Sequence, residues 1–147
     1  MFLLLPFSNF QIQNIYFLEK KINMIMDGFF TKFIYSTSFM TMNGLFFPFP
    51  VPSSPAHFSN YLLVDTLRHK EMVQLFQMIE KQLIQYYLMF YNINKIPVYT
   101  LKNQLQRGSV KYYRNCGSKN PSSFYIKISG IWENHYEVGI TFKLLEI

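Results

Sequence analysis

The sequence predicts a mainly β protein with one long helix, and three observations carry that prediction. Two dipeptides that favour tight hairpin turns, Asp27-Gly28 and Asn43-Gly44, each lie between runs of strand-forming residues. Apolar residues recur every three or four positions over residues 72–90, which is the spacing of one helix face. Residues 124–144 alternate apolar and polar side chains around a short polar loop, as hairpin strands do. A chain of 147 residues suits one domain, so we expect a single core over residues 1–147.

The first third of the chain predicts a three-stranded antiparallel meander over residues 16–50, because hairpin turns join neighbouring strands. Its middle strand would be long, residues 29–42. Four prolines in PFPVPSSPAHFSN, residues 48–60, cannot continue a ladder, so this stretch predicts an extended loop. Residues 1–14 are expected to form a loosely packed terminal segment. The opening MFLLLPF is too short to span a bilayer and no run of 18 apolar residues follows, so we expect no membrane partner.

The helix is expected to begin near Asp65, where Asp65 or Thr66 can cap its first turn. It should end before Asn92, since the residues ahead of Pro97 avoid the helical conformation. The stripe predicted to face the core is Met72, Leu75, Phe76, Ile79, Leu83, Tyr86 and Phe90. The opposite, solvated side is predicted to carry Lys70, Glu71, Lys81 and Gln85.

The last third predicts a short strand at KYYR, residues 111–114, then a loop rich in Asn, Gly, Ser and Pro, then a closing hairpin. The apolar residues predicted to face the core are Phe124, Ile126, Ile128, Val138, Ile140, Phe142 and Leu144. The alternation places Lys127 and Lys143 on the opposite, exposed face as near neighbours, beside Tyr125.

The element order matches one known architecture. Three strands, one helix and two strands (β-β-β-α-β-β) is the order of a five-stranded OB-type barrel, in which the helix lies between strands three and four. A generic α+β sheet covered by one helix fits the same order, and we keep it as the alternative. There is no internal repeat and no βαβ alternation, which disfavours solenoids and Rossmann-like folds.

The charge is unevenly distributed along the chain. Fourteen Lys and Arg against eight Asp and Glu give a net charge of +6, and residues 81–132 contain no Asp or Glu. A basic, acid-free segment of this kind favours a polyanionic partner. The single cysteine, Cys116, excludes an internal disulfide and favours a reducing, intracellular compartment.

The sequence gives little support for an enzymatic function. His57, His69 and His135 lie far apart and show no zinc-ligand spacing, so no metal or other cofactor is expected. There is no Gly-rich phosphate loop and no nucleophile elbow. Glu133 and Glu137 could form an acid/base pair, but we interpret them as a solvated loop rim. The sequence therefore predicts a non-enzymatic protein.

Nucleic-acid binding is the better-supported function. Single strands are held by cations that follow the backbone and by aromatic rings that stack on bases, so the two residue types must share one exposed surface. In KYYR, strand alternation would turn one of the two tyrosines outward. Taken alone, Trp132 is interpreted as a packing residue. The candidate binding residues are Lys32, Tyr99, Lys102, Arg107, Lys111, Tyr112, Tyr113, Arg114, Tyr125, Lys127, Trp132 and Lys143.

Residues 16–50 and 125–147 also carry a family resemblance. Their Asp-Gly turn, FTKFIYS strand, MNG turn and closing Ile-Trp and Gly-Ile-Thr-Phe-Lys hairpin resemble single-stranded DNA-binding proteins of large eukaryotic DNA viruses and Polinton-type elements. The resemblance implies an OB-fold protein that coats single strands in replication or recombination, in the nucleus or a viral replication compartment. It places Lys32, Trp132 and Lys143 at or near the binding face. The chain ends in LLEI, without the acidic tail by which phage proteins of similar function recruit polymerase, which puts recruitment of replication proteins by that route in doubt.

A second hypothesis explains the same composition. Exposed Tyr and Phe are as typical of protein interfaces as of base stacking, so the chain could be a viral or element-encoded interaction or structural module whose basic charge is incidental. A salt-resistant homodimer indifferent to DNA would favour that alternative. The sequence leaves open whether RNA competes with single-stranded DNA and whether the protein forms homo-oligomers.

Overall fold

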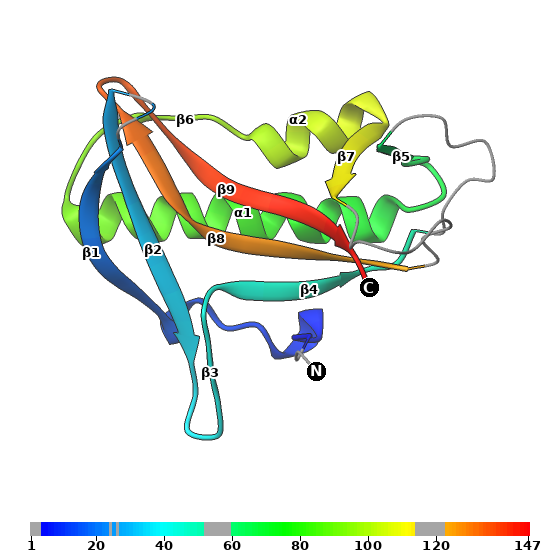
Figure 1. Ribbon diagram of the computed structural model, residues 1–147, viewed down its shortest axis with the longest axis horizontal. Coiled ribbons are helices and arrows are strands. Elements are labelled where there is room, and N and C mark those ends of the chain that lie inside the picture. The colour runs from blue at the N-terminus through cyan, green and yellow to red at the C-terminus, as the bar shows by residue number, and fades with distance from the viewer. Residues whose placement is uncertain (1–3, 24, 26, 52–59, 114–122) are drawn as a thin grey trace.

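The computed structural model describes residues 4–23, 25, 27–51, 60–113 and 123–147. It is mainly β, with one mixed, strongly curved sheet and two helices (Figure 1). The long helix α1 (Lys70–Tyr91) runs behind the sheet, and the short helix α2 (Thr100–Arg107) lies beside the edge of strand β9. Among the described residues, no helix combines the length and apolar character needed to cross a membrane.

The strands range from two to eleven residues in length. They are β1 (Ile15–Asn23), β2 (Gly28–Ser36), β3 (Thr41–Met42), β4 (Leu45–Phe49), β5 (Tyr61–Leu63), β6 (Ile96–Pro97), β7 (Ser109–Tyr113), β8 (Phe124–Asn134) and β9 (Glu137–Glu146). Two 3₁₀ turns, Phe7–Asn9 and Ile12–Asn14, precede β1.

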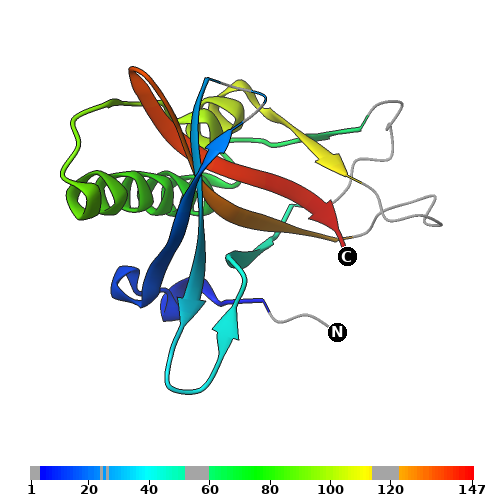
Figure 2. The same cartoon turned by 60° about the vertical axis from the view of Figure 1, so that its left-hand side comes forward.

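The sheet order is β1-β2-β8-β9-β7-β5, with β3 added to β2, β4 to β8 and β6 to β9. Strands β6 and β7 run parallel to β9, and the other pairs are antiparallel. In the described chain the two ends of this order, β1 and β5, do not pair with each other, so the sheet does not close into a barrel. Figure 2 shows β1 and β2 crossing the direction of β8 and β9, as expected of a strongly twisted sheet.

The predicted closing hairpin is confirmed and forms the centre of the sheet. Strand β9 pairs along one edge of β8. The other edge of β8 is shared, because β4 pairs with residues 124–128 and β2 pairs with residues 130–134. A bulge between Ile128 and Gly130 separates these two halves. The inward residues Phe124, Ile126, Ile128, Val138, Ile140 and Leu144 are buried as predicted, and Phe142 is half-buried.

The predicted meander is wrong in its third strand. The hairpin of β1 and β2 forms, but β2 ends at Ser36 and only the two-residue β3 continues beside it. Strand β4 leaves β2 and pairs with β8 instead. Asn43-Gly44 still makes the turn, and Gly44 has a φ of 105°, which favours glycine. The turn redirects the chain to a new partner, which local turn chemistry does not specify.

Gly28 does not have the turn role that the sequence suggested. It pairs with Asn23 on one side and Asn134 on the other, inside β2. A Cβ atom at this position would lie 1.9 Å from the carbonyl oxygen of Glu133. Glycine is therefore required for the close approach of β2 to β8.

Helix α1 is confirmed, but it begins at Lys70 and not near Asp65 as expected. The Oδ1 atom of Asp65 accepts the N–H groups of Leu67 and Arg68, so Asp65 caps a turn that precedes the helix. At the other end Asn92 is left-handed and its N–H donates to the last turn. Most of the predicted stripe is buried or half-buried, but Phe90 is 61% exposed. The predicted solvated side, Lys70, Glu71, Lys81 and Gln85, is exposed.

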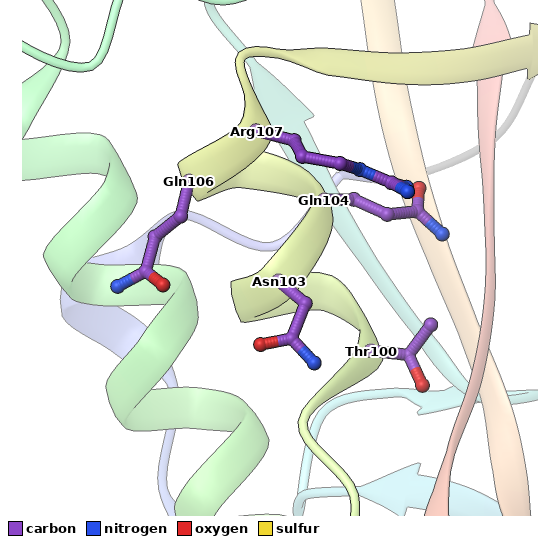
Figure 3. A pocket seen from close by; sticks show the side chains of 5 residues that line it. All are labelled: Thr100, Asn103, Gln104, Gln106 and Arg107. Atoms are coloured by element: carbon purple, nitrogen blue, oxygen red, sulfur yellow. The ribbon is translucent and has the colours of Figure 1, made fainter.

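Helix α2 was missed, because the stretch after Pro97 reads as a linker. Its apolar residues Leu101 and Leu105 are only four positions apart, too short a pattern to predict a helix, yet both are fully buried. The carboxylate of Glu80, on α1, accepts the N–H groups of Leu101 and Lys102 at 2.9 Å each. Burial raises the pKa of Glu80 despite these hydrogen bonds. Figure 3 shows the Gln104 and Arg107 side chains on one side of α2 and the Gln106 side chain on the other.

The buried side chains form one aromatic-rich cluster that extends from Leu5 to Leu144. Leu5 is 2% exposed and its N–H donates to Phe46 O. The ring of Phe7 stacks on Phe47 at a centroid distance of 5.3 Å. The first residues described are therefore packed onto β4, in contrast to the loosely packed segment expected. Phe76 of α1 contacts the same strand at Phe47 and Phe49.

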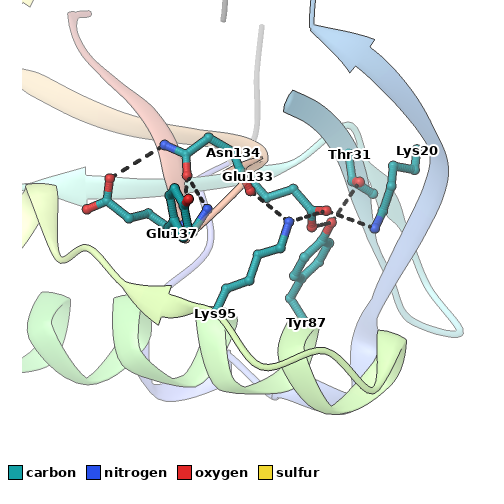
Figure 4. Close-up of polar contacts among 8 residues, drawn as sticks. Lys20, Thr31, Tyr87, Lys95, Glu133, Asn134 and Glu137 are labelled. Atoms are coloured by element: carbon teal, nitrogen blue, oxygen red, sulfur yellow. Dashed lines mark hydrogen bonds and ion pairs between the residues drawn. The ribbon is translucent and has the colours of Figure 1, made fainter. Parts of the chain in front are cut away.

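A buried carboxylate joins the sheet to α1 at the β8–β9 hairpin. Glu133 is 4% exposed, so its interpretation as part of a solvated rim is wrong. The hydroxyl of Tyr87 donates to Glu133 Oε2 at 2.5 Å, and Lys20 and Lys95 donate to Oε1 at 3.2 and 3.1 Å (Figure 4). The Thr31 hydroxyl lies 3.4 Å from the Tyr87 hydroxyl. Glu133 thus connects β8 to β1, α1 and the α1–β6 connection.

These contacts set the ionisation of the network. Burial alone raises the pKa of Glu133, but the hydrogen bonds from Tyr87, Lys95 and Lys20 outweigh it, so the pKa is lowered from its usual 4.5. Burial and the hydrogen bond to Glu133 raise the pKa of Tyr87. The network therefore contains a carboxylate and a neutral phenol at neutral pH.

We expect Glu133→Ala to lower the free energy of unfolding by about 3 kcal/mol, because two partly buried lysines lose their common carboxylate. Urea denaturation at pH 7 measures the change. Glu137→Ala is the matched control, since the one side-chain contact of Glu137 among the described residues is with Asn134 of the same hairpin, at 3.5 Å. Equal losses in the two variants would contradict this role of Glu133.

The contribution of Glu133 should also depend on pH. Because its pKa is lower in the folded state, its stabilisation is present above pH 4.5 and is lost as the pH falls through the lowered pKa. The difference in unfolding free energy between wild type and Glu133→Ala should shrink from pH 7 to pH 3. Glu80 titrates in both proteins and cancels in this difference. A difference that stays constant or grows toward pH 3 would contradict the assignment.

Candidate nucleic-acid interface

The sheet turns one side toward α1 and the other toward solvent. Directly opposite residues of paired strands point to the same side, so the pairings define the second surface. Phe30 pairs with Trp132, Lys32 with Gly130, and Phe46 with Lys127. We call this surface the outer face. Its side chains are Lys21, Phe30, Lys32, Phe46, Lys111, Tyr113, Tyr125, Lys127, Trp132, Thr141 and Lys143.

Two lysines lie directly opposite each other at the centre of the outer face. Lys127 on β8 pairs with Lys143 on β9, as the alternation predicted. Like charges in this position repel each other and destabilise the sheet. Their ammonium groups are placed over different rings, Lys127 at 5.5 Å from Phe46 and Lys143 at 5.1 Å from Tyr113. The pair therefore spreads positive charge across four strands, β4, β8, β9 and β7.

Aromatic rings lie on both sides of this lysine pair. Tyr113 on β7 is 41% exposed and has the ammonium groups of Lys143 and Lys111 near its ring. On the other side the rings of Phe46 and Tyr125 lie 6.3 Å apart. Cations and partly exposed rings thus alternate across the strands, which is the arrangement that single-strand binding requires.

Two glycines let aromatic rings lie along the sheet surface. A Cβ atom at Gly139 would lie 2.6 Å from the Trp132 indole, and one at Gly130 would lie 2.8 Å from the Phe30 ring. The Trp132 Nε1–H donates to Ile140 O at 3.2 Å, which fixes the indole. Trp132 therefore packs on the sheet and still presents part of its ring on the outer face.

The outer-face lysines have no carboxylate partner within the described residues. Both ion pairs found there involve Glu133, which points inward together with Val138 and Thr31. Within these residues, no carboxylate neutralises the charge of Lys32, Lys111, Lys127 or Lys143. In the same described part of the chain, no group of three His, Cys, Asp or Glu residues is placed to hold a metal ion.

The structure does not place all of the other predicted residues on this face. Tyr112 is fully buried, with its ring 5.0 Å from that of Phe124, so Tyr113 is the outward tyrosine of KYYR. Tyr99 and Lys102 line a recess of about 400 Å³ on the other side of α2, together with Lys81 of α1. Arg107 lies on α2 near the outer face. Arg114 is outside the described residues.

A recess connects the outer face to α2. It has a volume of about 310 Å³ and is lined by Tyr113, Trp132, Lys143 and Lys111 from the sheet and by Thr100 and Gln104 from α2. A neighbouring recess of about 510 Å³ is lined by Thr100, Asn103, Gln104, Gln106 and Arg107 (Figure 3). Because Thr100 and Gln104 line both, the two recesses are adjoining.

Several residues of this surface were missed from the sequence. Phe30 and Phe46 were not among the candidate binding residues, and only the pairing of β2 and β4 with β8 places them outward. Lys21 lies opposite Phe30. Thr100 and Gln104 were missed with α2, whose apolar pattern is too short to predict a helix.

Comparisons with known proteins found no matching family model, no matching curated protein and no matching solved structure. The functional interpretation therefore rests on the residues of this chain and their arrangement. The outer face can hold phosphates through its lysines and stack unpaired bases on its rings.

We expect Lys143→Glu to raise the free energy of unfolding of the isolated protein by about 0.5 kcal/mol, because it converts a like-charge cross-strand pair into an attractive one. Urea denaturation at low salt measures the gain, which should diminish at high salt. Lys21→Glu is the control, because Lys21 lies opposite Phe30 and not opposite a lysine. An equal gain in both variants would show that the effect comes from net charge.

Proposed function

We propose that this protein binds single-stranded DNA through the outer face, without catalysing a reaction and largely without sequence preference. The observation that supports this best is the Lys127–Lys143 pair, which lies between partly exposed rings and has no carboxylate partner in the described chain. Placing like charges opposite each other costs stability, and a phosphate backbone would relieve that repulsion.

The rings favour single strands over duplex DNA as the ligand. In a duplex the base faces are stacked on one another, whereas in a single strand they can stack on side chains such as Tyr113 and Tyr125. The Trp132 and Phe30 rings lie along the sheet and would extend that platform. Phosphate contacts from lysines carry no base information, which agrees with a coating role.

The family and fold assignments are part of the same proposal. If β3, β5, β6, α2 and β7 are set aside, the remaining elements follow the OB-type order, with β1, β2 and β4 before α1 and with β8 and β9 after it. Together with the resemblance of residues 16–50 and 125–147, this order supports a distant relation to OB-type coating proteins of DNA viruses and Polinton-type elements, acting in replication or recombination. Because the sheet of this protein is open, the protein would differ from such relatives in not closing its barrel.

A protein-interaction role is the second candidate, and the edge of the sheet favours it. Strand β1 ends the sheet order, and its Tyr16, Leu18 and Ile22 are 54, 43 and 74% exposed. An apolar edge strand is a surface on which another chain can pair. This surface is distinct from the Lys127–Lys143 pair, so the two functions can be tested separately.

We expect the protein to bind an oligo-dT of about 30 nucleotides more tightly than the corresponding duplex, with affinity falling as salt rises. Lys127→Ala/Lys143→Ala should reduce the slope of log K against log salt by about 1.4, since each neutralised phosphate of a single strand contributes about 0.7. Fluorescence anisotropy over a salt series measures both effects, and RNA of equal length serves as competitor.

The matched control is Lys70→Ala/Lys81→Ala, which removes two exposed lysines from α1 and leaves the outer face intact. It should bind with nearly the wild-type slope. No binding by the folded wild-type protein at low salt, or equal slopes in the two double variants, would contradict the proposal. A salt-resistant dimer that ignores DNA would favour the interaction role.

A further inference from the structure

One face of α2 carries hydrogen-bonding side chains at helical spacing. Thr100, Asn103, Gln104 and Arg107 lie at positions i, i+3, i+4 and i+7, opposite the buried Leu101 and Leu105. Three of the four are neutral, and the face has no acidic residue. A solvated helix face more often carries Lys and Glu, so this stripe has the composition of a recognition surface.

The side chains of this stripe have no polar partner in the part of the chain that the structure describes. Within the described residues, none of the Thr100, Asn103, Gln104 and Arg107 side chains makes a hydrogen bond or ion pair. Gln104 is only partly exposed and lines both recesses of the outer face. Tyr113 and Trp132 line the recess of about 310 Å³ as well. The Gln104 amide therefore shares that recess with two rings on which a base would stack.

We propose that the recess between α2 and β9 binds one purine base of a single strand and that Gln104 reads its edge, while Asn103 and Arg107 line the adjoining recess. This inference rests on the proposed function. Glutamine and asparagine pair bidentately with adenine, and arginine pairs bidentately with guanine, so all three side chains favour purines. The recess volume of about 310 Å³ lies at the lower end of small-ligand pockets, which suits a single base.

Lysines are placed to hold the sugar-phosphate part of the same nucleotide. Lys111 and Lys143 line the recess and flank the Tyr113 ring at 5.5 and 5.1 Å. Phosphate contacts set the register of a bound strand, and base-edge contacts then discriminate at the position so fixed. The protein would therefore coat DNA broadly and prefer a purine at one position of each site.

The test compares two oligonucleotides of about 30 nucleotides by competition anisotropy at one salt concentration. One is oligo-dT, and in the other every third thymidine is replaced by deoxyadenosine, which limits the self-stacking of an all-adenine strand. We expect wild type to prefer the mixed strand at least fivefold, roughly the discrimination of one modest base-edge pair. Gln104→Leu should lose that preference while binding oligo-dT within about twofold of wild type.

Gln106→Leu is the matched control, because Gln106 lies on the same helix but points away from Gln104 and Arg107 (Figure 3). It should keep the wild-type preference. Equal binding of both strands by wild type would overturn this inference, and so would a preference for the mixed strand that is undiminished in Gln104→Leu. In either case, salt-dependent binding of oligo-dT would still uphold the proposed function. Failure to bind either strand overturns both.

Discussion

The carboxylate of Glu133 is the interaction on which the arrangement of the sheet depends. It lies at the end of β8 and joins that strand to Lys20 of β1, Tyr87 of α1 and Lys95 after α1. A buried carboxylate without partners would be strongly unfavourable, so the three donors constrain where β1 and α1 can lie. The same end of β8 pairs with β2, where Gly28 permits the close approach.

The two sides of the β8–β9 hairpin have opposite chemistry. One side buries Ile126, Ile128 and Leu144 against the core, and the other carries Lys127 and Lys143 with no acidic partner in the described chain. Burial of the apolar side stabilises the hairpin and offsets the repulsion between the two lysines on the outer side. This division explains how a strand can carry unfavourable charge and remain the best-paired part of the sheet. It also means that changes in binding and changes in stability can be separated by residue.

Sequence patterns were sufficient where local periodicity determines the structure. The closing hairpin, the position of Lys127 beside Lys143, and helix α1 follow from spacing alone. Long-range pairing could not be obtained this way, so β4 was assigned to the wrong neighbour and Phe46 was left out of the candidate binding residues. Glu133 was read as solvated because its partners lie 38 or more positions away. Helix α2 is too short for its period to be recognised, and the recess lined by Gln104 was missed with it.

Photocrosslinking would test the central claim most directly. An oligo-dT containing a photoreactive thymidine analogue can be bound to the wild-type protein, irradiated and digested, and the linked residues identified by mass spectrometry. Binding on the outer face predicts crosslinks to Tyr113, Tyr125 and Trp132, suppressed by excess unlabelled single strand and by high salt. Crosslinks confined to the exposed side of α1 or to the β1 edge would contradict it.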